Sequence, residues 1–271
     1  MVADHEVVLS GGVANAGRVV RVGDHVLRPS NPHTPSVHAL LRALRATGFE
    51  GASEPEGVDP DGRERLAFVP GDVAEPPFPA WVQTDEALAS VAELLSALHR
   101  AGAAAQAAGA FDPGAWSWSA EMADPDGGPI VCHNDVCLEN VVFRDGRAVA
   151  LLDFDFAAPG RPVYDVAQLA RMCVPVDDDV NATRLGWADA DRPGRLRLVA
   201  DTSGLDGRGR GELLSILDDG IARGGEFVRR RVEAGDPGFV AMWADMGGAE
   251  RFDRRRRWWA TARARYEGAL R

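Results

Sequence analysis

The sequence contains no lysine, and all 30 of its basic residues are arginines. This absence excludes mechanisms that need an amine side chain, such as a Schiff base or a P-loop with its phosphate-binding lysine. Cysteine is also scarce: Cys132, Cys137 and Cys173 have no metal-ligand spacing, so we expect reduced, packing thiols in a cytoplasmic protein. No uncharged apolar run approaches the roughly 18 residues that cross a bilayer, so no membrane span is expected.

Positive charge is in deficit as well, since 41 acidic residues oppose the 30 arginines and give a net charge of −11. This field disfavours a nucleic-acid partner and favours a cationic small molecule. Two arginine runs, 229–231 and 254–257, are therefore interpreted as solvated helix faces, with Trp258 and Trp259 facing the core. The 271 residues, 45% of them hydrophobic, have room for one large domain or two lobes.

The first 70 residues alternate short apolar stretches with turns, as β-structure does. A helix is expected from Thr34 to Gly48, because Pro35 suits a first helical position and apolar residues recur at helical spacing. The expected order is three strands, a helix and two strands, with the strands over 6–9, 18–22, 25–28, 54–58 and 65–69.

The remainder of the chain is predicted to be mostly helical. Residues 70–79 are interpreted as a linker, and Thr84 is expected to cap a long amphipathic helix that ends within the tract 101–110. The acidic stretch 174–210 is interpreted as irregular, with a flexible loop at Gly207–Gly211, and the chain from 212 onward as helical.

The chemistry-bearing residues lie between 130 and 155. An apolar run leads to His133-Asn-Asp135, and Asn140 follows Asp135 by five positions. A hairpin around Asp145-Gly146 then ends at Asp153, which the hairpin should return to the side of Asn140. An aspartate can orient or deprotonate a nucleophilic hydroxyl, while amide and carboxylate oxygens suit Mg²⁺. The spacing therefore indicates phosphoryl transfer.

This stretch resembles the aminoglycoside phosphotransferase family, the small-molecule relatives of protein kinases, in its His-x-Asp-x-x-x-x-Asn and hydrophobic-Asp-Phe-Asp motifs. The continuation through Gly160 to Asp165-Val-Ala is also similar, so the resemblance is specific over about 130–170. It implies an α+β, protein-kinase-like fold. A β-rich N-lobe would cover residues 1–70 and a mostly helical C-lobe residues 71–271, with ATP or GTP between them.

The resemblance also implies roles for individual residues. Asp135 would be the catalytic residue, and Asn140 and Asp153 would hold Mg²⁺. His133 would support the catalytic loop, and Asp165 would begin a helix and accept backbone hydrogen bonds from that loop.

The nucleotide would be held by three further segments. Ser10, Gly11 and Gly12, in the glycine-rich turn that runs to Gly17, would cover the phosphates. Phe68 and Val69, within the expected hinge at 66–71, would meet the adenine. Arg28 on the third strand would hold the phosphates.

Arg28 is also where the sequence departs from the family. Kinase-like enzymes place a lysine there and pair it with a glutamate on the next helix. No acidic residue lies between Arg28 and Glu50, and the helix offers only His38. We favour a rebuilt site in which Arg28 needs no glutamate, because the acid and metal set is complete. The alternative is weakened or lost ATP binding.

The favoured function is ATP- and Mg²⁺-dependent transfer of a phosphoryl group to a hydroxyl of a small molecule, such as an aminoglycoside or a related antibiotic or metabolite. The alternative is a catalytically weak or inactive kinase-like binding or immunity protein. Asp155 is left open between the metal and a solvated loop. The remaining acidic residues are expected to be exposed loop charge, with an acidic acceptor pocket as the alternative; they are Asp177, Asp178, Asp179, Asp189, Asp191, Asp218 and Asp219.

Overall fold

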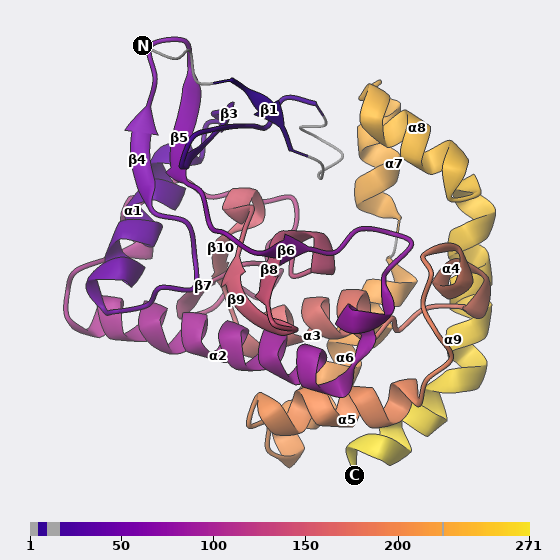
Figure 1. The fold of residues 1–271 in the computed structure, drawn as a ribbon. Coiled ribbons are helices and arrows are strands. Elements are labelled where there is room, and N and C mark those ends of the chain that lie inside the picture. Colours follow the sequence, from indigo (N-terminus) through magenta and orange to yellow (C-terminus); the bar gives the residue numbers. More distant parts are fainter. Residues whose placement is uncertain (1–4, 10–16, 224) are drawn as a thin grey trace.

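The computed structural model describes residues 5–9, 17–223 and 225–271. Figure 1 shows the N-terminal strands at one end of the molecule, the C-terminal helices at the other and short strands between them. A β-rich part is thus followed by a mostly helical part, as expected; a boundary at residue 70 stays a prediction. Within the described ranges, no helix is both long enough and apolar enough to pass through a membrane.

The N-terminal part is an antiparallel five-stranded sheet with one helix. The expected order of three strands, a helix and two strands is confirmed, with some strands shorter than expected. The sheet order is β1-β2-β3-β5-β4. The elements are β1 (Val7–Val8), β2 (Val20–Val22), β3 (His25–Pro29), α1 (Thr34–Ala46), β4 (Pro55–Val58) and β5 (Arg63–Ala67).

Helix α1 forms for the reasons that the sequence suggested. Pro35 stands in its first turn, where a missing N–H costs nothing, and Gly48 follows the helix at a φ of 88°. Its apolar face, including Leu40 and Leu44, is buried against the long helix α2. This packing fixes α1 beside the sheet that carries Arg28.

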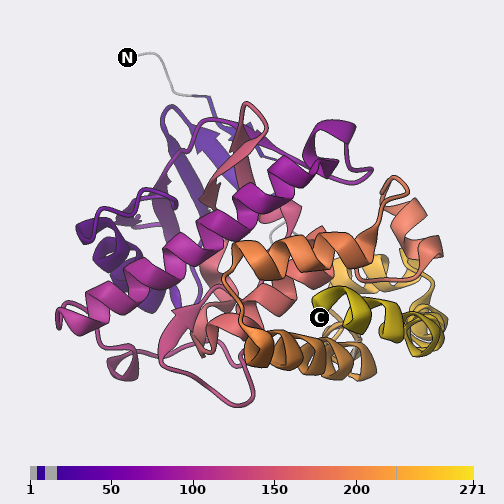
Figure 2. The ribbon, with the colours of Figure 1, turned by 90° about the horizontal axis from the view of Figure 1, so that it is seen from below.

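Helix α2 (Asp85–Ala107) is a long central helix, and Figure 2 shows it crossing one side of the molecule. Thr84 accepts a hydrogen bond from the Ala87 amide at 3.1 Å, the N-cap that the sequence predicted. Its buried residues, such as Val91 and Leu95, lie in a core shared with α1, β9 and α3. The helix extends through most of 101–110 before the expected loop begins.

The central strands position the candidate site. The hairpin is confirmed, and its Asp145-Gly146 turn has φ angles of 50° and 74°, as a type I′ turn requires. One sheet has the order β6-β8-β9, and β7 pairs with β10. The elements are β6 (Asp72–Val73), β7 (Ile130–Cys132), β8 (Val141–Arg144), β9 (Arg147–Leu151), β10 (Ala158–Gly160) and α3 (Pro162–Cys173).

Gly71 lies where the chain leaves the expected hinge and enters β6. Its φ is 151°, and a Cβ built there would lie 2.5 Å from the Phe143 carbonyl oxygen on β8. Only glycine allows this close approach without a shift of the backbone. The segment interpreted as a linker is therefore held against the central hairpin at its first residues.

The C-terminal part differs from expectation between 174 and 210, where helices replace the expected irregular chain. Gly207–Gly211 begins α6 because Asp206 caps it, accepting from the Gly209 amide at 2.8 Å. The helices are α4 (Asp179–Arg184), α5 (Arg192–Thr202), α6 (Gly207–Ala222), α7 (Glu226–Glu233), α8 (Pro237–Asp245) and α9 (Gly248–Leu270).

Candidate active site

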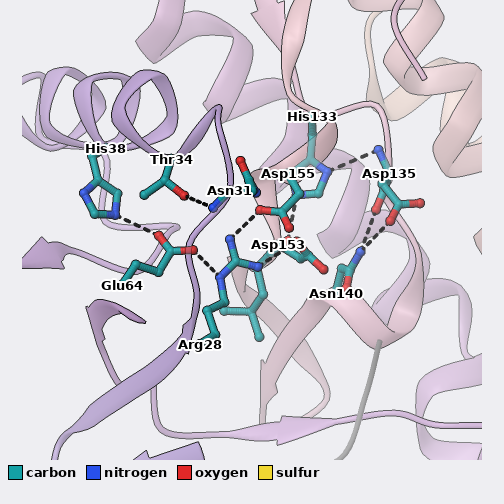
Figure 3. A network of polar contacts seen from close by, with 11 residues as sticks. Arg28, Asn31, Thr34, His38, Glu64, His133, Asp135, Asn140, Asp153 and Asp155 are labelled. Atoms are coloured by element: carbon teal, nitrogen blue, oxygen red, sulfur yellow. Dashed lines mark hydrogen bonds and ion pairs between the residues drawn. The ribbon is translucent and has the colours of Figure 1, made fainter. Parts of the chain in front are cut away.

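Asp135 and Asn140 lie on the loop that follows β7, and they contact each other directly (Figure 3). The Asn140 Nδ2 donates to the Asp135 backbone oxygen and to its Oδ2, both at 3.0 Å. Within the described chain, the Asn140 side-chain oxygen accepts no hydrogen bond. The pair therefore presents one carboxylate and one free amide oxygen, both hard donors.

Asp165, in the first turn of α3, braces this loop. Its carboxylate accepts the backbone amides of His133 and Asn134, both at 2.8 Å, and contacts His99 Nε2 at 2.9 Å. The expected backbone hydrogen bonds are thus confirmed. Burial alone would raise the pKa of Asp165, but the hydrogen bond from His99, its charge and the hydrogen bond from the His133 amide lower it. Asp165 is therefore held as a buried carboxylate, which fixes the backbone on the approach to Asp135.

Leu152 joins the Asp135 loop to Asp153. Its carbonyl oxygen lies 2.8 Å from His133 Nε2, and its amide donates to the Asn140 carbonyl oxygen at 2.8 Å. The Asp135 amide donates to His133 Nδ1 at 3.3 Å, so Nε2 carries the proton. Asp153 itself has a φ of 58°, a left-handed conformation that aspartate tolerates better than most residues. The two loops are thereby held as one unit.

Arg28 lies across this unit from β3 and contacts three carboxylates (Figure 3). Its Nη1 lies 2.9 Å from Asp153 Oδ1, and its Nη2 lies 2.6 Å from Asp155 Oδ1. Asp155 is therefore neither a solvated loop residue nor a free ligand in this structure. Burial lowers the pKa of Arg28, but these carboxylates outweigh it and raise the pKa above its ordinary value. The guanidinium is a permanent cation at the site.

The third carboxylate corrects the expectation that Arg28 needs no glutamate. This carboxylate belongs to Glu64. The Arg28 Nε donates to Glu64 Oε1 at 2.6 Å, and His38 Nε2 lies 2.8 Å from the other oxygen of Glu64. Glu64 stands on β5 directly opposite Arg28, so the partner comes from the sheet instead of the helix. The sequence analysis searched only the helix and missed it. The pairing of β3 with β5, read residue by residue, is the signal that finds it.

The site carries more negative charge than Arg28 neutralises. Glu64, Asp153 and Asp155 surround this one guanidinium. Burial and the neighbouring Asp153 raise the pKa of Asp155 to about 6 in spite of Arg28. Burial also raises the pKa of Asp135, and the charge of Asp153 adds to that rise. Surplus carboxylate charge beside free oxygen donors fits a divalent cation such as Mg²⁺.

The expected nucleotide contacts are described in part. Ser10, Gly11 and Gly12 lie outside the described residues. The Phe68 amide donates to the Asp24 carbonyl oxygen at 2.8 Å, and the Arg21 guanidinium lies 3.8 Å from the centre of the Phe68 ring. Among the described residues, the Val69 backbone makes no hydrogen bond, and its contact with an adenine stays a prediction.

The acidic residues expected to be exposed loop charge divide into two groups. Asp179, Asp189, Asp191 and Asp219 are exposed, whereas Asp177 and Asp178 are not. Asp177 and Asp178 are buried and bind arginines of α9, Asp177 through Arg251 and Asp178 through Arg254. Arg251 and Arg255 are buried as well, so within the run 254–257 the expected solvated face is limited to the exposed Arg256 and Arg257. Trp259 is buried in the core as expected. The three cysteines are likewise buried and unpaired.

The chain resembles known proteins in sequence and in fold. A model described as a phosphotransferase enzyme family matches residues 103–199. The trifolitoxin immunity protein of Rhizobium leguminosarum bv. trifolii is 32% identical over 219 residues, which cover 78% of this chain and 79% of that protein.

Two solved structures share the fold. A choline/ethanolamine kinase family protein from Mesorhizobium loti has a TM-score of 0.62 at 20% identity, covering 98% of this chain and 92% of that one. The GDP complex of wild-type aminoglycoside 2'-phosphotransferase-IIIa has a TM-score of 0.57 at 15% identity, covering 95% and 94%. The α+β, protein-kinase-like two-lobed fold is thereby confirmed. With the motif built around Asp135 and a relative that spans most of both chains, the chain belongs to the phosphotransferase enzyme family.

Proposed function

We propose that this protein transfers the γ-phosphoryl group of ATP or GTP, with Mg²⁺, to a hydroxyl group of a small molecule. The observation that carries the proposal is the contact of Asp135 with Asn140, held beside Asp153 by the two hydrogen bonds of Leu152. The complex of a similar structure with GDP supports a nucleotide in this fold.

In the proposed reaction, Asp135 orients the acceptor hydroxyl and accepts its proton. The hydroxyl oxygen forms a bond to the γ-phosphorus as the bond to the β,γ-bridging oxygen breaks, and the nucleoside diphosphate leaves. The raised pKa of Asp135 suits a group that must take up a proton during the reaction. Catalysis here depends on positioning and charge, since the protein forms no covalent intermediate.

The phosphates would be held by Arg28 and by the backbone of the turn over residues 10–17. Mg²⁺ would be held by the Asn140 side-chain oxygen and the Asp153 carboxylate, and it would neutralise phosphate charge. Because Arg28 binds Asp153 and Asp155 in this structure, its Nη groups must exchange a carboxylate for a phosphate when nucleotide binds. Glu64 would keep the Nε in place during that exchange.

A second candidate is a binding or immunity protein without transfer activity. It is favoured by the immunity protein that shares 32% identity with this chain, and by the arginine that stands where kinase-like enzymes have a lysine. Arginine binds phosphate as a planar fork and is not equivalent to a lysine.

Isothermal titration calorimetry with ATP and GTP, with and without Mg²⁺, separates the two candidates. Metal-dependent binding, followed by acceptor-dependent release of nucleoside diphosphate, supports phosphoryl transfer. A folded protein that binds neither nucleotide at millimolar concentration contradicts it and leaves the binding protein as the function.

A further inference from the structure

The carboxylate that the proposed function assigns to Mg²⁺ already holds a cation of the chain itself, the Arg28 guanidinium (Figure 3). Its two terminal nitrogens divide between two aspartates, Nη1 at 2.9 Å from Asp153 Oδ1 and Nη2 at 2.6 Å from Asp155 Oδ1. The Arg28 side chain is 9% exposed, whereas those of Asp153 and Asp155 are 31% and 21% exposed. The guanidinium therefore contacts both aspartates from inside the protein, and part of each aspartate remains accessible to solvent.

The two aspartates are held in place by contacts that do not involve Arg28. Phe154, which stands between them, is buried, and its ring lies 4.5 Å from the ring of His133, centre to centre. Leu152 precedes them and makes the two hydrogen bonds to the Asp135 loop. Phe156 follows them, and its carbonyl oxygen accepts from the Asn134 side chain at 3.0 Å. The two carboxylates should therefore stay side by side when Arg28 is absent.

Each of the two carboxylates has an oxygen that Arg28 does not use. Among the described residues, the Oδ2 atoms of Asp153 and Asp155 accept no hydrogen bond. Carboxylate oxygens of this kind suit Mg²⁺, which completes its coordination with water and substrate phosphates. A divalent cation on these oxygens would lie next to the guanidinium, and two positive charges in contact repel each other. Arg28 and the metal therefore compete for the same pair.

The other end of the Arg28 side chain is fixed to the N-terminal sheet. Its Nε donates at 2.6 Å to Glu64, which is 1% exposed and also contacts His38 at 2.8 Å. The partners of Nη1 and Nη2 lie 125 and 127 positions further along the chain. A phosphate can take the place of these carboxylates, because the planar guanidinium binds both groups as a fork. Arg28 can thus change partners at its Nη end while Glu64 retains its Nε.

We propose that Arg28 is a built-in substitute for the divalent cation. In the protein without nucleotide, Arg28 occupies Asp153 and Asp155 and keeps the metal out. When the phosphates of a nucleotide bind its Nη groups, Arg28 releases both carboxylates, and Asp155 becomes a further oxygen donor beside Asp153. Arg28 thereby admits the metal only together with the nucleotide. This rests on the proposed function for the role of the nucleotide.

The exclusion of the metal can be measured without nucleotide and without catalytic activity. The probe is Mn²⁺ alone, which takes the same oxygen ligands as Mg²⁺ and whose unbound form is counted by its electron paramagnetic resonance signal. Arg28→Gln should bind Mn²⁺ at least about tenfold more tightly than the wild-type protein, because the competing charge is gone. Adding Asp153→Asn to Arg28→Gln should remove this gain.

Two further variants control for stability and for charge. Arg28→Gln leaves the buried Glu64 without its arginine, which destabilises the fold. The double variant Arg28→Gln/Glu64→Gln removes both buried charges and should show the same gain in Mn²⁺ affinity. Arg65→Gln is the matched control: it breaks an ion pair with Asp59 of 2.7 Å on the same sheet and should leave Mn²⁺ binding unchanged. Circular dichroism checks that each variant is folded.

No gain in Mn²⁺ affinity in the folded Arg28 variants would overturn the proposal. An equal gain in Arg65→Gln, or a gain that survives Asp153→Asn, would also overturn it. If the wild-type protein binds no nucleotide but the Arg28 variants gain Mn²⁺ binding, the phosphotransferase proposal fails and the exclusion of the metal by Arg28 stands. If nucleotide binds but the gain is absent, the phosphotransferase proposal stands and the role of Arg28 as a substitute cation fails.

Discussion

Arg28 and Glu64 lie directly opposite each other on β3 and β5, and the Arg28 Nε donates to Glu64 at 2.6 Å. In kinase-like enzymes a lysine of the third strand pairs with a glutamate of the following helix. Here the acid is on the neighbouring strand, and the helix contributes His38, which binds the other oxygen of Glu64. The charge pair is kept, although both of its members have changed identity or position.

Glu64→Gln should destabilise the protein by about 3 kcal/mol, because it leaves the buried Arg28 without its full counter-charge. It should also weaken nucleotide binding, because a neutral amide at position 64 holds the Arg28 Nε less firmly than a carboxylate does. The control is Glu56→Gln, which removes a surface contact to His25 and should change stability by less than about 1 kcal/mol. Urea unfolding of both variants checks this. Equal losses of unfolding free energy in the two variants would mean that the buried pair of Arg28 and Glu64 stabilises the protein no more than a surface contact does.

Asp135→Asn should lower kcat by about 10²- to 10⁴-fold and leave nucleotide affinity unchanged. The amide cannot take the proton of the acceptor hydroxyl, but it keeps the size of the carboxylate. Asp145→Asn is the control, because Asp145 is an exposed turn residue with a φ of 50° that asparagine tolerates. Nucleoside diphosphate release and calorimetry give the two readouts, and an unchanged kcat in Asp135→Asn would remove the proposed base.

Because of Asp165, the free energy of unfolding should fall as the solution becomes acidic. Its pKa is lowered in the folded protein, so it binds fewer protons there than in the unfolded chain. Its contribution is therefore complete above about pH 4, the usual carboxyl value, and is lost as the pH falls through the folded pKa. The free energy of unfolding of Asp165→Asn should lie about 3 kcal/mol below wild type at pH 6. This difference in the free energy of unfolding should become smaller below pH 4. A difference that stays constant with pH would contradict the prediction.

Gly71→Ala should cost about 3 kcal/mol, because its Cβ would lie 2.5 Å from both the Phe143 carbonyl oxygen and a Val142 methyl group. Gly109→Ala is the matched control: its φ is 67°, but a Cβ there meets nothing within 4 Å, so only the left-handed backbone opposes it, by about 1 kcal/mol. Denaturant midpoints compare the two. A larger loss in the control would show that backbone conformation, not the contact with β8, determines the effect.

The local part of the site could be predicted from the sequence. Asp135, Asn140 and Asp153 are brought together by a loop and a hairpin, and the Asp-Gly turn fixes that hairpin within a few residues. The backbone hydrogen bonds of Asp165 followed from the family resemblance. These contacts depend on short stretches of chain, which spacing describes well.

The rest depends on pairings between distant segments. Glu64 is 36 positions from Arg28, and Arg251 is 74 positions from Asp177, so no local pattern joins them. The stretch 174–210 was misinterpreted as irregular for a different reason. Asp178, Asp191 and Asp206 cap helices α4, α5 and α6 by accepting amides of their first turns. Aspartate is equally typical of loops and of such caps.

Asp177 and Asp178 are buried next to arginines of α9, the last helix of the chain. A chain shortened before α9 would leave both carboxylates buried without their counter-charges. The last helix is therefore required for a stable C-terminal part, and shortening the protein from that end would remove more than an exposed tail.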